Sequence, residues 1–428
     1  MQRKQTTSTP LLFHPRAWGA GIAASALLAT SACGGGDDDS NSSDEGTDFD
    51  GQELVIWADE TQGPIINDAI EAVQADYNID VEVKEYAEEL QESYLAAIEQ
   101  DEGPDIVVGA PDWAGALVSA GGAEPIFLDD KQRDAINSTA VSAYTVDGQV
   151  YGFPYAVENL GLIRNTELAP EQPETFDDLL ADAEAAGTDR SLIVPQGKDG
   201  DPYHAYPLYS SMGGYLFGYD PSEGFDADDI GIDSQGGIDA LEKFAELGAD
   251  DVLSTSVNHE NAFELFTEGD APYLISGPWA INTVRDAGVD FEVGAIPGFD
   301  GQEPAAPFLG AQGFYVNPEG DNKATALDFV TTALMDEEFI DILAVDGNRV
   351  PAHLEAAESY TDGNDVAAGF AAAGEDAIPM PNIPAMGAVW EPLGRAIADA
   401  VDGASTGEEA AETAAQVVRE QVESQKAE

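Results

Sequence analysis

Apolar and polar positions along the chain form blocks that predict strands and helices in turn. Residues 53–58 (ELVIWA) are an apolar run typical of a buried strand, and residues 64–77 place apolar side chains on one helical face. Alternation in residues 80–86 predicts a half-buried strand, residues 88–100 predict a helix, and residues 104–110 (PDIVVGA) predict another buried strand. This β-α-β-α-β series indicates an α/β fold with a mostly parallel sheet.

Similar signals continue through the rest of the chain. Thr175 and Asp178 form a predicted helix N-cap pair in front of a helical stretch. Further strands are predicted at residues 191–195, 271–277, 291–297 and 310–317, and further helices at residues 177–187, 237–248, 323–335 and 408–422. A chain of 428 residues is long enough for two ordinary domains, so we expect two α/β lobes.

The composition adds a strong negative charge. Asp and Glu number 83 against 16 Lys and Arg, which gives a formal net charge of −67, while 43% of the residues are hydrophobic. The apolar share suffices for packed cores. The charge should repel nucleic acid and anionic membrane surfaces, so we expect no nucleic-acid partner.

The acidic residues are scattered along the chain rather than confined to a tail, which is typical of solvated surfaces. Scattered acid with few basic residues suits a protein that stays soluble in high salt, where like-charge repulsion is screened. We therefore predict a salt-loving (halophilic) source and a melting temperature that rises with salt concentration. Thermal melts across a salt series test this, and equal stability at low and high salt would contradict it.

The first 50 residues have the pattern of a secretion signal followed by a tether. The start is basic, residues 17–30 are apolar but too short to span a membrane, and the only cysteine, Cys33, follows the small residues TSA. This is similar to the bacterial lipoprotein signal, in which the cysteine thiol receives a diacylglycerol. We predict a signal peptide at residues 1–32, lipidation of Cys33 and an acidic flexible tether at residues 33–50.

Strong catalytic signatures are absent from the sequence. It contains no phosphate-binding loop, no G-x-S-x-G motif and no CxxC pair, and His204, His259 and His353 lack partners at metal-ligand spacing. The acidic run at residues 226–233 lacks the glutamate of a calcium loop. We therefore predict no metal, no cofactor and no enzymatic activity.

The tryptophans point to a ligand. Trp57 lies inside an apolar strand and is expected to pack in a core, whereas Trp113 and Trp279 each follow a predicted strand, where α/β sheets bind ligands. Trp390 follows the neutral, proline-rich residues 378–389. Aromatic faces beside carboxylates suit a sugar, because a pyranose stacks on the ring while Asp and Glu accept hydrogen bonds from its hydroxyls.

Blocks of sequence that span nearly all of the mature chain carry a resemblance to one family. They are ELVIW, GPDIVVGAPDWAGALVSAGGAEPI, YGFPYAVENLGLIRN, DPYHAYPLYSSMGGYLF, AFELFTEGDAPYLISGPWA, KATALDFV and MPNIPAMGAVW. In this order they resemble the maltose/maltodextrin-binding proteins, which belong to family 1 of the extracellular solute-binding proteins of ABC importers. The resemblance implies a two-lobed periplasmic-binding-protein-like fold with three crossings between the lobes, and a ligand in a cleft that closes on a hinge.

The resemblance also gives expected lobe boundaries. We expect an N-terminal lobe from residues 51–157 and 304–362 and a C-terminal lobe from residues 158–303 and 363–425, in a monomeric protein. Closure would have to favour the loaded form, so that the importer can distinguish it from the open form.

Several site residues follow from the resemblance. Asp112 and Glu158 match carboxylates that bind sugar hydroxyls, Asp201 stands where the family has a glutamate, and Trp279 and Trp390 match tryptophans that stack on successive glucose rings. The full set of expected ligand-binding residues is Asp59, Glu60, Asp112, Trp113, Glu158, Asp201, Tyr203, Trp279 and Trp390. Met380 is expected at the rim of the site, and Arg395 lies one place from a family arginine near it.

The chain departs from the family pattern at two places. Gly109 stands where the family has a stacking tryptophan, while Trp113 replaces an arginine four residues on. The lysine of a family Asp-Lys pair is missing near Asp59 and Glu60. Maltose, longer maltodextrins, trehalose and other disaccharides therefore all remain candidate ligands.

The predicted function is that of a lipid-anchored sugar-binding protein on the extracellular face of the cell membrane. It would deliver an oligosaccharide to the permease subunits of an ABC importer. Two other classes remain open on the residues alone: an anchored glycoside hydrolase, which also surrounds a sugar with carboxylates and aromatic rings, and a structural surface lipoprotein without a ligand.

Overall fold

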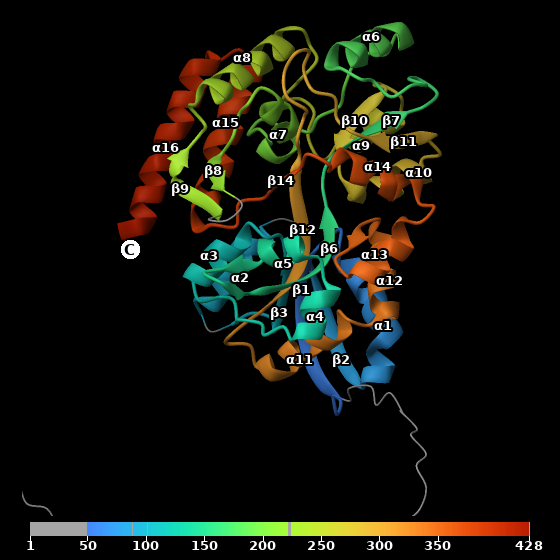
Figure 1. Cartoon of the computed structure of the whole chain (residues 1–428), viewed down its shortest axis with the longest axis vertical. Coiled ribbons are helices and arrows are strands. Elements are labelled where there is room, and N and C mark those ends of the chain that lie inside the picture. The colour runs from blue at the N-terminus through green and yellow to red at the C-terminus, as the bar shows by residue number, and fades with distance from the viewer. Residues whose placement is uncertain (1–48, 88, 101, 221–223, 428) are drawn as a thin grey trace, which may run out of the picture. The chain divides into compact units, whose positions relative to one another are not determined.

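The computed structural model (Figure 1) describes residues 49–87, 89–100, 102–220 and 224–427. These residues belong to a single unit, residues 46–428. The predicted signal peptide, Cys33 and nearly all of the predicted tether lie outside the described residues.

The largest sheet has the strand order β13-β6-β12-β3-β1-β2, and β14 pairs with β12 beside it. Its first three strands are β1 (Gln52–Asp59), β2 (Ile79–Tyr86) and β3 (Ile106–Gly109), connected by α1 (Gly63–Tyr77) and α2 (Leu90–Ile98). β1 pairs in parallel with both β2 and β3. The β-α-β-α-β series predicted for the start of the chain is therefore confirmed.

The rest of this sheet is mixed, because β14 (Ile378–Pro379) pairs in parallel with β12 while the other strands join antiparallel. β12 (Phe308–Val316) pairs antiparallel with β3 and with β6 (Gly152–Glu158), and β13 (Val350–Pro351) pairs antiparallel with β6. Figure 1 shows β12 and β6 next to each other in the sheet. The prediction of a mostly parallel sheet is wrong here, because local patterns identify strands but do not show in which direction a distant strand joins them.

Apolar periodicity explains how the sheet is covered. β1 buries Leu54, Ile56 and Ala58 on one face, and α1 buries a stripe that includes Ile66 and Ile70. The helices α11 (Lys323–Ala333) and α12 (Glu337–Gly347) add their own apolar residues to this core. Fully burying one such side chain is worth about 1.5–3 kcal/mol, so this stripe fixes α1 against the sheet.

The other face of the sheet carries an aromatic cluster. Tyr94, Tyr144 and Tyr315 are fully buried in it, together with apolar residues of α2 and α3 (Trp113–Ser119). Trp57 packs at the edge of this cluster with its ring centroid 4.7 Å from that of Tyr86. The core-packing role expected for Trp57 agrees with this position.

A second, smaller sheet has the antiparallel order β10-β7-β11. Its strands are β7 (Gly161–Asn165), β10 (Tyr273–Ser276) and β11 (Phe291–Gly294). Residues 191–195 do not form one of its strands as predicted. Ile193 makes only an isolated bridge to Leu274. By contrast, the predicted cap pair of Thr175 and Asp178 is confirmed as a capping box at the start of α6 (Phe176–Ala186).

Helices pack around this second sheet and beside it. In Figure 1, α15 (Trp390–Val401) and α16 (Gly407–Ala427) lie side by side next to α8 (Gln235–Ala249). The remaining elements are α4 (Asp130–Ala135), α5 (Ser138–Ala143), β4 (Thr145–Val146), β5 (Gln149–Val150), α6 (Phe176–Ala186), α7 (Pro202–Ser211), β8 (Phe217–Asp220), β9 (Gly224–Ile230), α9 (Ala262–Thr267), η1 (Pro278–Ala280), α10 (Ile281–Asp286), α13 (Leu354–Thr361), α14 (Asp365–Ala373), β14 (Ile378–Pro379) and η2 (Pro384–Ala388).

The buried apolar residues separate into two groups, which define a two-lobed α/β fold. Those around the large sheet come from residues 49–156 and 311–352. Those around the small sheet and its helices come from residues 160–308 and 370–422. The expected lobe boundaries and the count of three crossings stay predictions.

The neutral segment before Trp390 contacts both groups of elements. Met380 and Met386 are buried in the core of the second group. The side-chain amide of Asn382 donates hydrogen bonds to the backbone carbonyls of Ala143 and Thr145, each at 3.0 Å. Gly115 of α3 comes so close that a Cβ atom there would lie 2.3 Å from the backbone nitrogen of Pro384. The segment is thus a packed connection as well as the support of Trp390.

Candidate functional site

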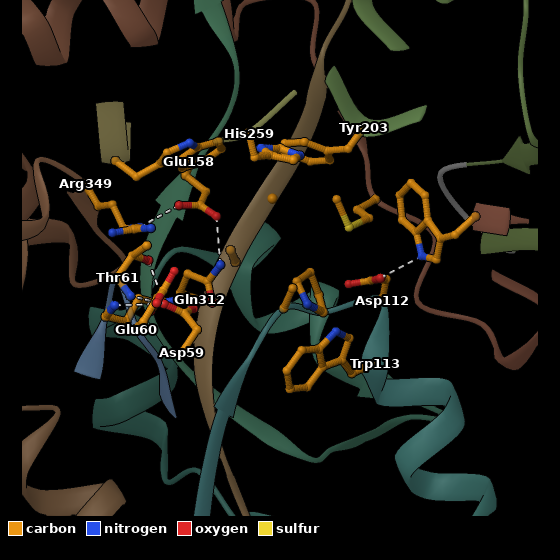
Figure 2. Close-up of a pocket in the computed structure, with 18 of the residues that line it drawn as sticks. Asp59, Glu60, Thr61, Asp112, Trp113, Glu158, Tyr203, His259, Gln312 and Arg349 are labelled. Carbon is orange, nitrogen blue, oxygen red and sulfur yellow. Dashed lines mark hydrogen bonds and ion pairs between the residues drawn. The ribbon is translucent and has the colours of Figure 1, made fainter. Parts of the chain in front are cut away.

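A pocket of about 590 Å³ collects most of the predicted ligand-binding residues (Figure 2). Its lining includes Asp59, Glu60, Asp112, Trp113, Glu158, Tyr203, Trp279 and Trp390. The volume lies within the range of about 300–1,000 Å³ that is usual for small-molecule sites. Residues separated by more than 300 positions in the sequence therefore meet around one cavity.

The ends of strands position most of these side chains. Asp59 ends β1, Asp112 and Trp113 follow β3, Glu158 ends β6, and Trp279 follows β10. Tyr203 and Trp390 instead come from the first turns of α7 and α15. This agrees with the rule that ligands bind beyond the carboxyl ends of strands in α/β sheets.

Asp59 is tied into the turn between β1 and α1. Its Oδ1 accepts hydrogen bonds from the backbone nitrogens of Thr61 and Gln62, each at 2.8 Å, and its Oδ2 accepts one from the Gln62 side chain at 2.8 Å. These bonds hold the turn rigid. The neighbouring Glu60 is exposed.

Glu158 forms a buried ion pair that the sequence did not predict. Arg349 Nε donates to Glu158 Oε2 at 2.5 Å, and Gln312 Nε2 donates to Glu158 Oε1 at 2.8 Å (Figure 2). The side chains of Arg349 and Glu158 are only 4% and 7% exposed. Burial alone would lower the pKa of Arg349, but the charge of Glu158 outweighs this and raises that pKa, so the arginine stays a cation.

Asp112 and Trp390 join two distant parts of the pocket wall. Trp390 Nε1 donates a hydrogen bond to Asp112 Oδ2 at 3.1 Å. Burial raises the pKa of Asp112 to about 6, and the bond from Trp390 opposes that rise only in part. The charge of Asp112 therefore changes close to neutral pH.

The raised pKa of Asp112 predicts a pH-dependent stability. Because the folded protein holds this proton more tightly than the unfolded chain, the contribution of Asp112 to stability falls as pH rises from about 4 to about 6. In Asp112→Asn this loss is absent, so the variant should gain on the wild type by up to about 3 kcal/mol across that window. Urea unfolding of both proteins between pH 4 and pH 8 measures the difference. A difference that is constant with pH would contradict the prediction.

The ring of Trp113 lies directly over Gly109. A Cβ atom at Gly109 would be 2.2 Å from Trp113 Cε3, which no side chain can tolerate without movement. The changes from the family pattern at positions 109 and 113 are thus one structural feature, since the absent side chain at position 109 makes room for the ring at position 113.

This contact predicts the effect of Gly109→Ala. The added methyl group must displace the Trp113 ring, so we expect a loss of about 1–3 kcal/mol in the free energy of unfolding. Gly387→Ala is the matched control, because a Cβ atom at Gly387 meets nothing within 4 Å. Urea unfolding of the two variants checks this, and equal stability of both would show that Trp113 is not held against Gly109.

Tyr203 and Trp279 form another aromatic wall. Their ring centroids are 6.2 Å apart, and burial together with the charge of Glu158 raises the pKa of Tyr203 well above its usual range. The phenol is therefore neutral and keeps its proton for donation. A Cβ atom at Gly277 would lie 2.1 Å from Trp279 Cζ3, so this ring also rests on a glycine.

Asp201 does not line the pocket. Its Oδ1 accepts a hydrogen bond from the backbone nitrogen of His204 at 3.0 Å, which caps the start of α7. Its Oδ2 lies 2.7 Å from His204 Nδ1 and 2.8 Å from His259 Nε2. Burial alone would raise the pKa of Asp201, but these two histidines outweigh it and lower that pKa. The sugar-binding role expected for Asp201 stays a prediction.

The pocket also contains residues that the sequence analysis missed. They are Gln62, His259, Phe263, Gln312 and Arg349. The chain has only 16 Lys and Arg residues, and a buried cation needs a partner. The small number of basic residues was therefore the one sign in the sequence that Arg349 could pair with a carboxylate. The expected rim residue Met380 does line the pocket. Arg395 does not line it; its side chain is 61% exposed and lies 3.6 Å from Asp199.

A two-lobed α/β fold with an aromatic and acidic pocket agrees with the class that the family resemblance implies, a solute-binding protein. The sequence pattern of the family described as bacterial extracellular solute-binding protein matches residues 68–371, so the chain belongs to that family. Among the described residues, no helix has both the length and the apolar character that crossing a membrane requires.

Proteins with similar sequences are also named as sugar-binding or solute-binding proteins. The chain is 31% identical to the maltotriose-binding protein of Pyrococcus abyssi, over 73% of this chain and 69% of that protein. It is 25% identical to the galactooligosaccharide-binding protein of Bacillus subtilis, over 87% and 90%. It is 28% identical to the maltooligosaccharide ABC transporter solute-binding lipoprotein of Streptococcus pneumoniae, over 87% and 89%.

Proposed function

We propose that this chain is the sugar-binding component of an ABC importer and captures a maltooligosaccharide in the pocket described above. The observation that carries this proposal is the presence of Trp113, Trp279 and Trp390 around a cavity that also contains the carboxyl groups of Asp112 and Glu158. The rings offer faces on which pyranose units can stack. The carboxylates retain lone pairs for hydroxyl groups beyond the bonds they already accept.

The choice of sugar rests on the relatives together with the pocket. Two of the three relatives described above are named for maltotriose or maltooligosaccharide, and one of these names includes an ABC transporter. Three separate tryptophans suit a ligand of more than one ring better than a monosaccharide. Hinge closure around such a ligand would be the change that the permease subunits detect.

Calorimetry with maltotriose, maltose, trehalose and a galactooligosaccharide tests the proposal. We expect maltotriose to bind at one molecule per chain and to raise the melting temperature, with weaker binding of trehalose and the galactooligosaccharide. The absence of heat and of thermal shift for every sugar would favour a structural lipoprotein. Tightest binding of the galactooligosaccharide would overturn the proposed sugar but not the importer class.

The same preparation distinguishes binding from hydrolysis. We propose that the protein does not cleave its ligand, since the family and the named relatives are solute-binding proteins. Incubation of the protein with maltotriose should leave the sugar intact. Sustained release of glucose would show an anchored glycoside hydrolase instead.

We also propose that Cys33 carries a lipid that anchors the protein to the extracellular face of the cell membrane. The TSAC sequence after a short apolar segment supports this, as does the word lipoprotein in the name of the streptococcal relative. Cys33→Ala should prevent incorporation of labelled fatty acid. Equal labelling of the variant and the wild type would exclude this anchor.

A further inference from the structure

Two of the four histidines in the chain converge on one carboxylate. His204 Nδ1 lies 2.7 Å and His259 Nε2 lies 2.8 Å from the same oxygen, Oδ2 of Asp201. The two imidazole rings meet at 69° with their centroids 5.1 Å apart. One ligand atom from each of the three residues lies within 4.8 Å of the other two. His204 and Asp201 come from the start of α7, whereas His259 lies in the loop before α9.

This arrangement has the components of a cation site. Two imidazole nitrogens and a carboxylate oxygen are the donor set that suits zinc and its first-row neighbours, whereas magnesium and calcium prefer oxygen donors alone. The other oxygen of Asp201, Oδ1, accepts a hydrogen bond from the backbone nitrogen of His204 at 3.0 Å, and such bonds orient a carboxylate that binds a metal.

The distances from the carboxylate to the two histidines need little change to fit a metal ion. Two ligands of a tetrahedral zinc ion are about 3.3 Å apart, which follows from metal–ligand distances of about 2.0–2.1 Å. The hydrogen-bonded atoms here would therefore separate by about half an ångström, and the two ring nitrogens, which lie within 4.8 Å of each other, would take up the same spacing. His259 can supply that movement because its side chain is 67% exposed, while His204 is only 5% exposed and fixed.

The surroundings favour a cation at this position. The chain carries a formal net charge of −67, and the adjoining pocket contains Asp59, Glu60 and Asp112 besides the paired Glu158. His259 itself lines the pocket, so an ion held by it would lie at the edge of the candidate sugar site. Three protein ligands leave a fourth position of a tetrahedral ion open.

We propose that Asp201, His204 and His259 form a binding site for a first-row transition-metal dication of the zinc type. Binding requires His204 Nδ1 and His259 Nε2 each to give up the proton that it shares with Asp201. In a neutral ring that proton moves to the other ring nitrogen, and from a protonated ring it is released to solvent. The metal-bound form of His204 therefore carries its ring proton on Nε2, which is buried and has no hydrogen-bond partner among the described residues. The site should therefore bind zinc more weakly than one whose histidines are backed by carboxylates.

Metal titration of the full chain, prepared without a histidine tag and without sugar, tests the proposal. We expect zinc to bind at one ion per chain by calorimetry, and cobalt to give the visible absorption bands of a tetrahedral site. His259→Gln removes one ligand at an exposed position, so it should fold normally and weaken zinc binding at least about 10-fold. Asp201→Asn should have a similar effect.

Glu260→Gln is the matched control, because Glu260 is the exposed acidic neighbour of His259 in sequence. It should bind zinc like the wild type. Equal zinc affinity of the wild type and His259→Gln, or a stoichiometry that follows surface carboxylates and falls in Glu260→Gln, would overturn the proposal. So would the absence of one-to-one zinc binding in the wild type. Since no sugar is present, the outcome is independent of the proposed sugar binding.

Discussion

Replacing Arg349 with methionine is expected to lower the free energy of unfolding by about 3–5 kcal/mol, because it leaves a buried charge without its partner. Glu158 is 7% exposed and would keep only the hydrogen bond from Gln312. An unpaired buried carboxylate either stays charged at high cost or takes up a proton. In both cases the folded protein loses stability, and urea unfolding measures the loss in the free energy of unfolding.

Two further variants separate the cost of the unpaired charge from the loss of arginine itself. The double variant Arg349→Met with Glu158→Gln removes both charges and should recover part of the stability. Arg395→Met removes an exposed arginine and should change stability little, since exposed ion pairs contribute little. If the double variant were as unstable as Arg349→Met, the packing of the arginine side chain rather than its charge would be the main contribution.

The second large effect is expected at Trp390. Trp390→Ala removes a stacking face of the pocket together with the donor to Asp112, and should weaken maltotriose binding by about 1–3 kcal/mol. Trp390→Phe keeps an aromatic face but loses the donor, so it should fall between the wild type and Trp390→Ala. Calorimetry with maltotriose gives the three affinities.

Trp57→Phe controls for general effects of losing a tryptophan. Trp57 packs against Tyr86 and does not line the pocket, so maltotriose affinity should stay close to that of the wild type. Melting temperatures of all variants show whether each is folded. If Trp390→Ala bound maltotriose as well as the wild type, Trp390 would be a purely structural residue.

Local patterns in the sequence predicted the start of the fold well. The apolar runs before and after α1 identify β1, β2 and β3, and their parallel pairing follows from the helices between them. The antiparallel entry of β12 could not be predicted in this way. It depends on a return of the chain from the second lobe, and residues 310–317 carry no local mark of that path.

The sequence predicted those residues of the candidate site whose type suits a sugar and whose position follows a predicted strand. Trp113 and Trp279 directly follow strands, so their place beyond the strand ends could be inferred from the chain itself. The partners of Glu158 could not be inferred from the sequence, because Gln312 and Arg349 lie 154 and 191 residues away from it. Only the folded chain shows that both oxygens of that carboxylate are already bonded.

Residues 378–389 illustrate a question that the sequence left open. A neutral, proline-rich segment could be either a buried connection or the wall of a ligand site. In the structure, Met386 is fully buried, while Met380 is buried and also lines the pocket, and Trp390 begins α15 directly after the segment. One segment therefore is a buried connection and also lines the candidate pocket, two positions that a single pattern of apolar residues cannot distinguish.

The distribution of tryptophans provides an optical reporter within the molecule. Of the four tryptophans in the described residues, Trp113, Trp279 and Trp390 line the pocket, and Trp57 alone does not. Intrinsic fluorescence should therefore arise mainly from the pocket wall. Its emission maximum and its quenching by acrylamide should respond to any molecule that covers these rings. A binding isotherm can then be recorded on the unmodified protein at any salt concentration, without a label.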